Sequence, residues 1–411
     1  MKSAMQNSGK RWFIAVMATL VHLCLGTVYA WSFFQKTVSE TFGWSNSETA
    51  WAFSLAIFML GVTASWGGQN LQKFGPRKLA LIGAFLYAFG YIISYFALQN
   101  ESLWLLYFGY GIVGGIGLGL AYVTPVATVS KWFPDKQGLV TGMVVMGFGL
   151  GALLMSKLLA PIFLEYFEKD LAKTFLAIGI TLLVLLPFFA NFLNLPTEEK
   201  NTEISAEKLS ATKEILSPNF ILIWLIFMFN VVAGMIFISF QSPLLQDLLK
   251  SENVNLDTAT LEKSGATLIA ISALFNGLGR FFWGSISDKL GRVTTFRLLL
   301  LIEMGVFASL IFIKSPVLFS VGVCLILLNY GGGFGVLPSL IKDFFGTKLM
   351  PIVYGAALTA WGVGGILGPQ ITAYMKDHFS EDAGLYAYKV ALVLIALGIG
   401  LSFFVKNKKA Q

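Results

Sequence analysis

One arginine of the sequence, Arg280, lies inside a long apolar segment, where a charge is costly. It comes eight residues before Asp288, about 12 Å along a helix from that acid. Its planar guanidinium suits a carboxylate, and Asn276 is one turn away on the same face. These two residues are therefore predicted to hold a small anion in mid-membrane. The competing interpretations of Arg280 are a salt bridge between helices and a side chain that reaches the interface.

Three residues of the first apolar segment, His22, Tyr29 and Lys36, are seven apart and lie on nearly one stripe of a helix. Tyr29 could donate its hydroxyl to a carboxylate. Lys36 could draw anions into a cavity from its outer end, and His22 could carry a proton. The alternatives are packing for His22 and Tyr29 and interfacial placement for Lys36.

Other segments carry three further candidates. Tyr122 follows a glycine run and precedes Pro125, and Tyr330 begins a matching run. Glycines allow close packing and prolines allow kinks, so both tyrosines could line a cavity or simply pack. Glu303 lies midway along another apolar segment. It could be a proton-coupling acid, but a hydrogen bond between helices by its protonated form is the favoured interpretation.

No pattern for catalysis or metal binding accompanies these residues. The sequence has two histidines, and its two cysteines, Cys24 and Cys324, fall in separate apolar segments. An active site inside a membrane would need His, Asp or Glu clustered on facing helices. We therefore expect no enzyme activity, no catalytic residue, no metal and no cofactor.

The elements that must position the candidates are membrane helices. Of the 411 residues, 56% are hydrophobic and 12% are charged, and a soluble domain carries about twice that charged fraction. Apolar runs of about 20 residues predict membrane spans. Twelve are expected, at 12–34, 50–70, 78–98, 103–126, 138–160, 171–193, 219–243, 264–285, 294–313, 316–340, 351–373 and 385–405.

The basic residues predict the orientation. Nineteen Lys and Arg fall on the side of the termini, nine fall on the other side, and Arg280 completes the total of 29. The positive-inside rule then places both termini in the cytoplasm, and it explains the net charge of +7 without nucleic acid. The first segment has no small-residue cleavage site, so we expect it to be a retained membrane helix and not a signal peptide. We expect a monomer in the lipid bilayer, typical of a bacterial inner membrane.

The sequence also repeats itself. The loop after the second span recurs after the eighth at an offset of 216, as in Gly68 and Gly284. The glycine run of the fourth span recurs in the tenth at an offset of 213. Equal placement in both halves predicts a parallel pseudo-twofold along the membrane normal, with the site between the halves. The expected boundaries are a first six-helix bundle at 1–195, a cytoplasmic linker at 196–218 and a second six-helix bundle at 219–411.

These loops resemble the signature Gly-x-x-x-Asp-x-x-Gly-Arg of the major facilitator superfamily, and the resemblance covers essentially the whole chain. The loop residues are Gly68, Gly75 and Arg77 in the first copy and Gly284, Asp288, Gly291 and Arg292 in the second. Gln72 stands where the first aspartate is expected. The resemblance implies an all-α fold of twelve transmembrane helices and a charge-paired latch for alternating access, which Gln72 would weaken in the first half.

More narrowly, the chain resembles the oxalate/formate antiporter family, which is related to the monocarboxylate porters. The stretches that carry this resemblance are Gly26–Trp31, Lys131–Leu139, Asn276–Gly284 and Gly362–Pro369. The resemblance implies that Arg280 binds the substrate and that Tyr29, Tyr122 and Tyr330 are cavity aromatics. Trp361 replaces a second cation of the oxalate carrier, so a monoanion is expected in preference to oxalate.

The expected function is secondary transport of a small carboxylate anion such as formate, pyruvate or lactate. Proton-coupled porters of the resembled group carry an acid where this chain has Asn276, which favours anion exchange. Trp361 would either narrow the pocket toward short monocarboxylates or simply pack. The alternatives are a proton-coupled monocarboxylate symporter and a transporter-like carboxylate sensor.

Overall fold

The computed structural model describes residues 2–133, 136–196, 211–379 and 382–405. Most of the expected linker therefore lies outside the described residues, and so do Pro134 and Asp135 of the loop after the fourth span. At the far end of the expected linker, residues 211–215 are helical and the next long helix begins at Pro218.

The described chain is helical almost throughout, and three of its described membrane helices change pitch along their length. The first half contains α1 (Lys2–Leu25), a 3₁₀ segment (Gly26–Ala30), α2 (Trp31–Phe42), α3 (Asn46–Phe74), α4 (Pro76–Gln99), α5 (Leu103–Leu106), a π segment (Tyr107–Gly114), α6 (Gly115–Trp132), α7 (Gln137–Leu154), a second π segment (Met155–Leu159), α8 (Ala160–Tyr166) and α9 (Leu171–Ala190). The second half contains α11 (Pro218–Glu252), α12 (Thr258–Leu290), α13 (Arg292–Leu310), α14 (Pro316–Ala357), α15 (Thr359–Phe379) and α16 (Ala383–Ser402).

The predicted membrane spans are confirmed. In the described ranges, twelve helical segments are long and apolar enough to cross a bilayer, and each overlaps one expected span. Most are longer than expected; the first runs over Gly9–Phe42 and the eighth over Thr258–Leu290. Hydropathy detects only the apolar middle of a membrane helix. The helix itself continues as polar turns, some of them capped, beyond the hydrocarbon core of the bilayer.

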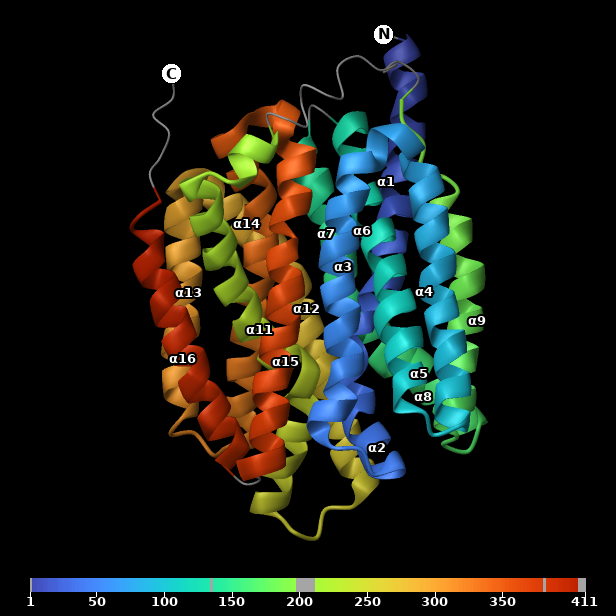
Figure 1. Ribbon diagram of the computed structural model, residues 1–411, viewed down its shortest axis with the longest axis vertical. Helices are drawn as coiled ribbons and strands as arrows, with labels where there is room; N and C mark the ends of the chain where they lie inside the picture. Colours follow the sequence, from blue (N-terminus) through green and yellow to red (C-terminus); the bar gives the residue numbers. More distant parts are fainter. Residues whose placement is uncertain (1, 134–135, 197–210, 380–381, 406–411) are drawn as a thin grey trace.

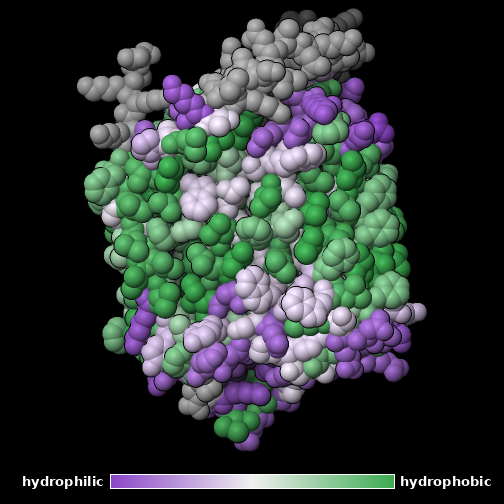
Figure 2. All heavy atoms as spheres, in the orientation of Figure 1, coloured by the Kyte–Doolittle hydropathy of each residue, from purple (hydrophilic) through white to green (hydrophobic). Residues whose placement is uncertain are grey.

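The helices form two groups that stand side by side (Figure 1). Helices α1 to α9 make one group, and α11 to α16 make the other. The chain enters α1 and leaves α16 on the same side, which we call the terminal side; the other is the opposite side. Figure 2 shows a hydrophobic band across the middle of the visible face, with hydrophilic residues gathered toward both ends. This distribution matches a bundle whose flanks face lipid.

The two halves share an unusual turn at equivalent positions. Gly75 ends α3 with φ 76° and ψ 153°, and Gly291 ends α12 with φ 85° and ψ 145°. Both amides donate to the carbonyl four residues earlier. Positive φ is rarely adopted by residues with a Cβ, which explains why glycine occupies both positions. The offset of 216 in the sequence is therefore also a repeat of backbone conformation.

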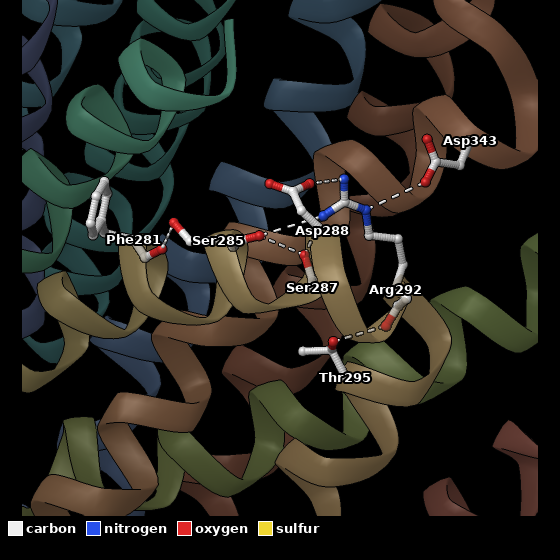
Figure 3. Close-up of polar contacts among 9 residues, drawn as sticks. Phe281, Ser285, Ser287, Asp288, Arg292, Thr295 and Asp343 are labelled. Atoms are coloured by element: carbon white, nitrogen blue, oxygen red, sulfur yellow. Dashed lines mark hydrogen bonds and ion pairs between the residues drawn. The ribbon is translucent and has the colours of Figure 1, made fainter. Parts of the chain in front are cut away.

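The signature loop of the second half is held by Arg292 (Figure 3). Its guanidinium donates to Asp288 and to the Ser287 hydroxyl, and its Nε lies 3.4 Å from a carboxylate oxygen of Asp343 on α14. Arg292 thus links the end of α12 to α14 within the second half. In the first half Gln72 is exposed, and Arg77 donates instead to the Asn191 side chain after α9.

Polar bonds join the two halves on the opposite side. The Asp377 carboxylate at the end of α15 accepts the amides of Asn46 and Ser47, each at 2.9 Å. These are first-turn amides of α3, which lack partners inside their own helix and carry its positive dipole. Lys36 also donates to Gln246 across the halves at 3.0 Å. An acid of the second half therefore caps a helix of the first.

We predict that Asp377→Asn loosens this closure, because the charged acceptor is lost while the side chain keeps its size. A cysteine at Ser242, a buried residue whose amide bonds Ser32 of the other half at 2.9 Å, reports the opening. Its maleimide labelling in detergent should speed up about two- to fivefold, the range of an exposed charge–dipole interaction. Asp382→Asn is the matched control, since Asp382 precedes α16 without a side-chain capping bond. Equal labelling rates in both variants would contradict the prediction.

Candidate functional site

Arg280 is positioned by α12, which packs closely against α14. Asp257 precedes the first residue of α12 and caps it, because its carboxylate accepts the Thr260 amide at 2.6 Å. This bond holds the pKa of that acid below its usual value. Glycines make the contact with α14. A Cβ at Gly335 would strike the backbone of Arg280, and one at Gly331 would strike that of Asn276. Small residues of this kind let membrane helices approach each other closely.

A second close crossing brings in the other half of the molecule. A Cβ placed on Gly149 of α7 would lie 2.8 Å from the Cα of Gly277 on α12. Gly277 follows Asn276 directly and lies within one turn of Arg280. The candidate site is therefore built where a helix of each half meets, and Arg280 faces the junction.

The guanidinium of Arg280 is buried and has no counter-ion among the described residues. Arg280 is 1% exposed, and its Nε donates to the Asn276 amide oxygen at a long 3.4 Å. The guanidinium carbon lies 4.8 Å from the ring centre of Phe334 and 5.7 Å from that of Phe148. Its two terminal nitrogens have no hydrogen-bond partner among the described residues. The cation–π contacts offset only part of the cost of this charge.

Tyrosines from both halves meet beside the arginine. Tyr29, in the 3₁₀ segment Gly26–Ala30, shares a hydrogen bond with the hydroxyl of Tyr330 on α14. Their rings lie edge to face, 6.0 Å apart. One hydroxyl pair thus links the first helix to the tenth span in mid-membrane.

Tyr122 and Trp361 close the next part of the site. Their ring centres are 5.0 Å apart, and Trp361 also contacts Phe334 at 4.8 Å. His22 lies behind Tyr122: the rings stack at 4.7 Å, and His22 Nε2 bonds the carbonyl of Tyr122 at 2.9 Å. In the described structure, the Tyr122 hydroxyl and the Trp361 indole nitrogen have no hydrogen-bond partner.

Sequence reasoning missed three residues of this cluster. Phe148 and Phe334 hold the guanidinium between them, but nothing separates them in advance from the other phenylalanines, 37 in all. Tyr354 is 2% exposed, and its hydroxyl is unpartnered in the described chain and lies close to that of Tyr122. It precedes Trp361 by seven residues, a helical spacing that could have indicated a shared face.

Other predicted residues lie elsewhere. Lys36 is on the opposite side, bonded to Gln246. Glu303 on α13 is fully buried and accepts the side-chain amide of Asn230 on α11 at 2.7 Å, a contact inside the second half. The signature loops lie toward the terminal side. Among the described residues, no group of three His, Cys, Asp or Glu is arranged for a metal ion.

A cavity of about 500 Å³ leads from Arg280 toward the terminal side. Its walls come from α7, α12 and α14 and from Arg292, the first residue of α13. Arg280 and Phe334 lie at its inner end and Asp288 and Arg292 at its outer end. A groove of about 610 Å³ elsewhere, between α11, α12 and α14, has mostly apolar walls and is remote from Arg280. This conformation is therefore open toward the terminal side and closed toward the opposite side.

Comparisons with known proteins agree with this architecture. The model of the Major Facilitator Superfamily matches residues 12–369. The oxalate:formate antiporter of Oxalobacter formigenes is 26% identical over 97% of this chain and 92% of its own. Apicoplast pyruvate carrier 1 of Toxoplasma gondii is 24% identical over 94% and 86%.

Among solved structures, a bacterial homologue of the human lysosomal transporter Spinster superposes with a TM-score of 0.71. It covers 97% of both chains at 16% sequence identity, so the likeness concerns the fold. The chain belongs to the Major Facilitator Superfamily and is a multi-pass membrane protein, a secondary transporter and not an enzyme.

Proposed function

We propose that the protein exchanges small monocarboxylate anions, with Arg280 as the residue that binds the carboxylate. The observation that carries the proposal is the buried guanidinium whose terminal nitrogens lack a partner in the described chain. A carboxylate entering through the cavity would accept both of them in a bidentate pair. Formate and pyruvate, which appear in the names of two relatives, are members of this substrate class, whereas the oxalate in the first name is a dicarboxylate.

The same charge gives exchange a physical reason. Closing the terminal side around an empty site would leave Arg280 uncompensated in a region of low dielectric constant. Closing it around a bound anion would enclose a neutral pair. Reorientation is then cheap only with substrate bound, so each anion that leaves is replaced by another. Both termini are assigned to the cytoplasm by the positive-inside rule, which makes the observed cavity the inward-facing one.

We expect Arg280→Ala to abolish exchange in proteoliposomes preloaded with formate, pyruvate or lactate. Arg280→Lys should lower the rate at least about tenfold, because an ammonium keeps the charge but not the planar fork. Arg297→Lys is the matched control: Arg297 is on α13 of the same half and bonds Ser402, away from the cavity. Undiminished exchange by Arg280→Lys would contradict bidentate recognition.

Proton symport makes a different prediction for Glu303. Glu303 bonds Asn230 within one half. We therefore expect the exchange rate of Glu303→Gln to stay within about twofold of the wild-type rate, a free-energy difference smaller than one weak hydrogen bond contributes. We also expect exchange to persist when an uncoupler collapses the pH gradient. Uptake driven by an imposed pH gradient without internal anion, and its loss in Glu303→Gln, would establish symport and overturn the exchange mechanism.

A further inference from the structure

We propose that the site binds a second hydrogen-bond acceptor of its substrate in addition to the carboxylate, and that the substrate is a small 2-oxo monocarboxylate. Arg280 would take the carboxylate, while Tyr122, Tyr354 and Trp361 would donate to the oxo oxygen at carbon 2. This inference rests on the proposed function and narrows it. It assigns to Tyr354 a role in specificity that follows from its position in the structure.

Tyr122, Tyr354 and Trp361 are buried, neutral hydrogen-bond donors that lack a partner in the described structure. Tyr122 and Trp361 are fully buried and Tyr354 is 2% exposed. In the described structure, none of their O–H or N–H groups has a hydrogen-bond partner. Buried polar groups without partners are uncommon and destabilising. Should the two hydroxyls bond each other, one O–H and the indole N–H would still lack an acceptor.

Tyr122 and Trp361 belong to the same aromatic cluster as the guanidinium, because the Phe148 ring contacts both of them and Arg280. The Tyr122 hydroxyl is close enough to interact with both Arg280 and Tyr354. The Trp361 ring lies between Tyr122, at 5.0 Å, and Phe334, at 4.8 Å; Phe334 in turn faces the guanidinium. A carboxylate held by Arg280 on the side of this cluster would have its next atoms among neutral donors and aromatic rings.

The donor set distinguishes ligand classes. Formate, acetate or propionate would pair with Arg280 but would offer no acceptor to the neutral donors. A second carboxylate would bring a full charge to hydroxyls and an indole, which do not neutralise it. An oxo oxygen is uncharged, accepts two hydrogen bonds and donates none. A site built to bond such a group rejects analogues that lack it, because its own buried groups then stay unpaired.

The test is competition for exchange by the wild-type protein in proteoliposomes. Pyruvate is compared with propionate, which lacks the oxo oxygen, with isobutyrate, which has a methyl group in its place, and with oxalate. We expect half-inhibition by pyruvate at a concentration at least about tenfold lower than for any of the three, since one satisfied buried donor is worth about that factor.

Variants assign the preference to residues. Tyr354→Phe removes one hydroxyl and should reduce the preference for pyruvate over isobutyrate about tenfold by weakening pyruvate alone. Trp361→Phe should act in the same direction. Tyr388→Phe is the matched control, a buried tyrosine of α16 that packs on Phe237 and Phe307. Its preference should equal that of the wild type.

The outcomes separate this inference from the proposed function. Equal competition by pyruvate and propionate, or preference for oxalate, overturns the 2-oxo specificity while carboxylate exchange stands. A wild-type preference that survives both Tyr354→Phe and Trp361→Phe overturns the assignment to these donors. Absence of exchange with every monocarboxylate overturns the proposed function itself.

Discussion

The site depends on one buried charge that has no counter-ion in the described chain, the guanidinium of Arg280 between the two helix bundles. Asn276 and the faces of Phe148 and Phe334 contact it, yet its terminal nitrogens find no partner in the described chain. Cation–π contacts contribute about 0.5–2 kcal/mol each, less than the full cost of burying a cation. The remaining free energy is available to a bound anion. We infer that it both recognises the substrate and links reorientation to its presence.

Close helix packing keeps this charge between the halves. Gly331 and Gly335 allow α14 to lie against α12, and Gly149 allows α7 of the other half to cross beside Gly277. Larger residues at these positions would force the helices apart and move the guanidinium. On the opposite side Asp377 caps α3, whereas a cavity reaches Arg280 from the terminal side. The two ends of one site are thus in different states, as alternating access requires.

The chemistry around the arginine divides into a charged part and a neutral part. Arg280 supplies the only charge of the cluster among its described members, and tyrosines and Trp361 supply uncharged donors. A monoanion with one further acceptor matches this division. Glu303, in contrast, bonds Asn230 inside the second half, so its polar contact serves the packing of α11 and α13.

The sequence by itself determined the twelve spans, because runs of apolar residues have few other stable environments than lipid. It also determined the repeat, since Gly75 and Gly291 occupy a turn that other residues rarely adopt. Arg280 was identifiable because a charge in an apolar membrane segment is costly and therefore usually has a function. Phe148, Phe334 and Tyr354 were not, because aromatic residues are frequent throughout the chain. Only the tertiary structure decided which of them meet, since contacts between α6, α7, α12 and α14 join residues far apart in sequence. It alone also decided which donors remain unpartnered, because a hydrogen bond depends on distance and direction and not on residue type.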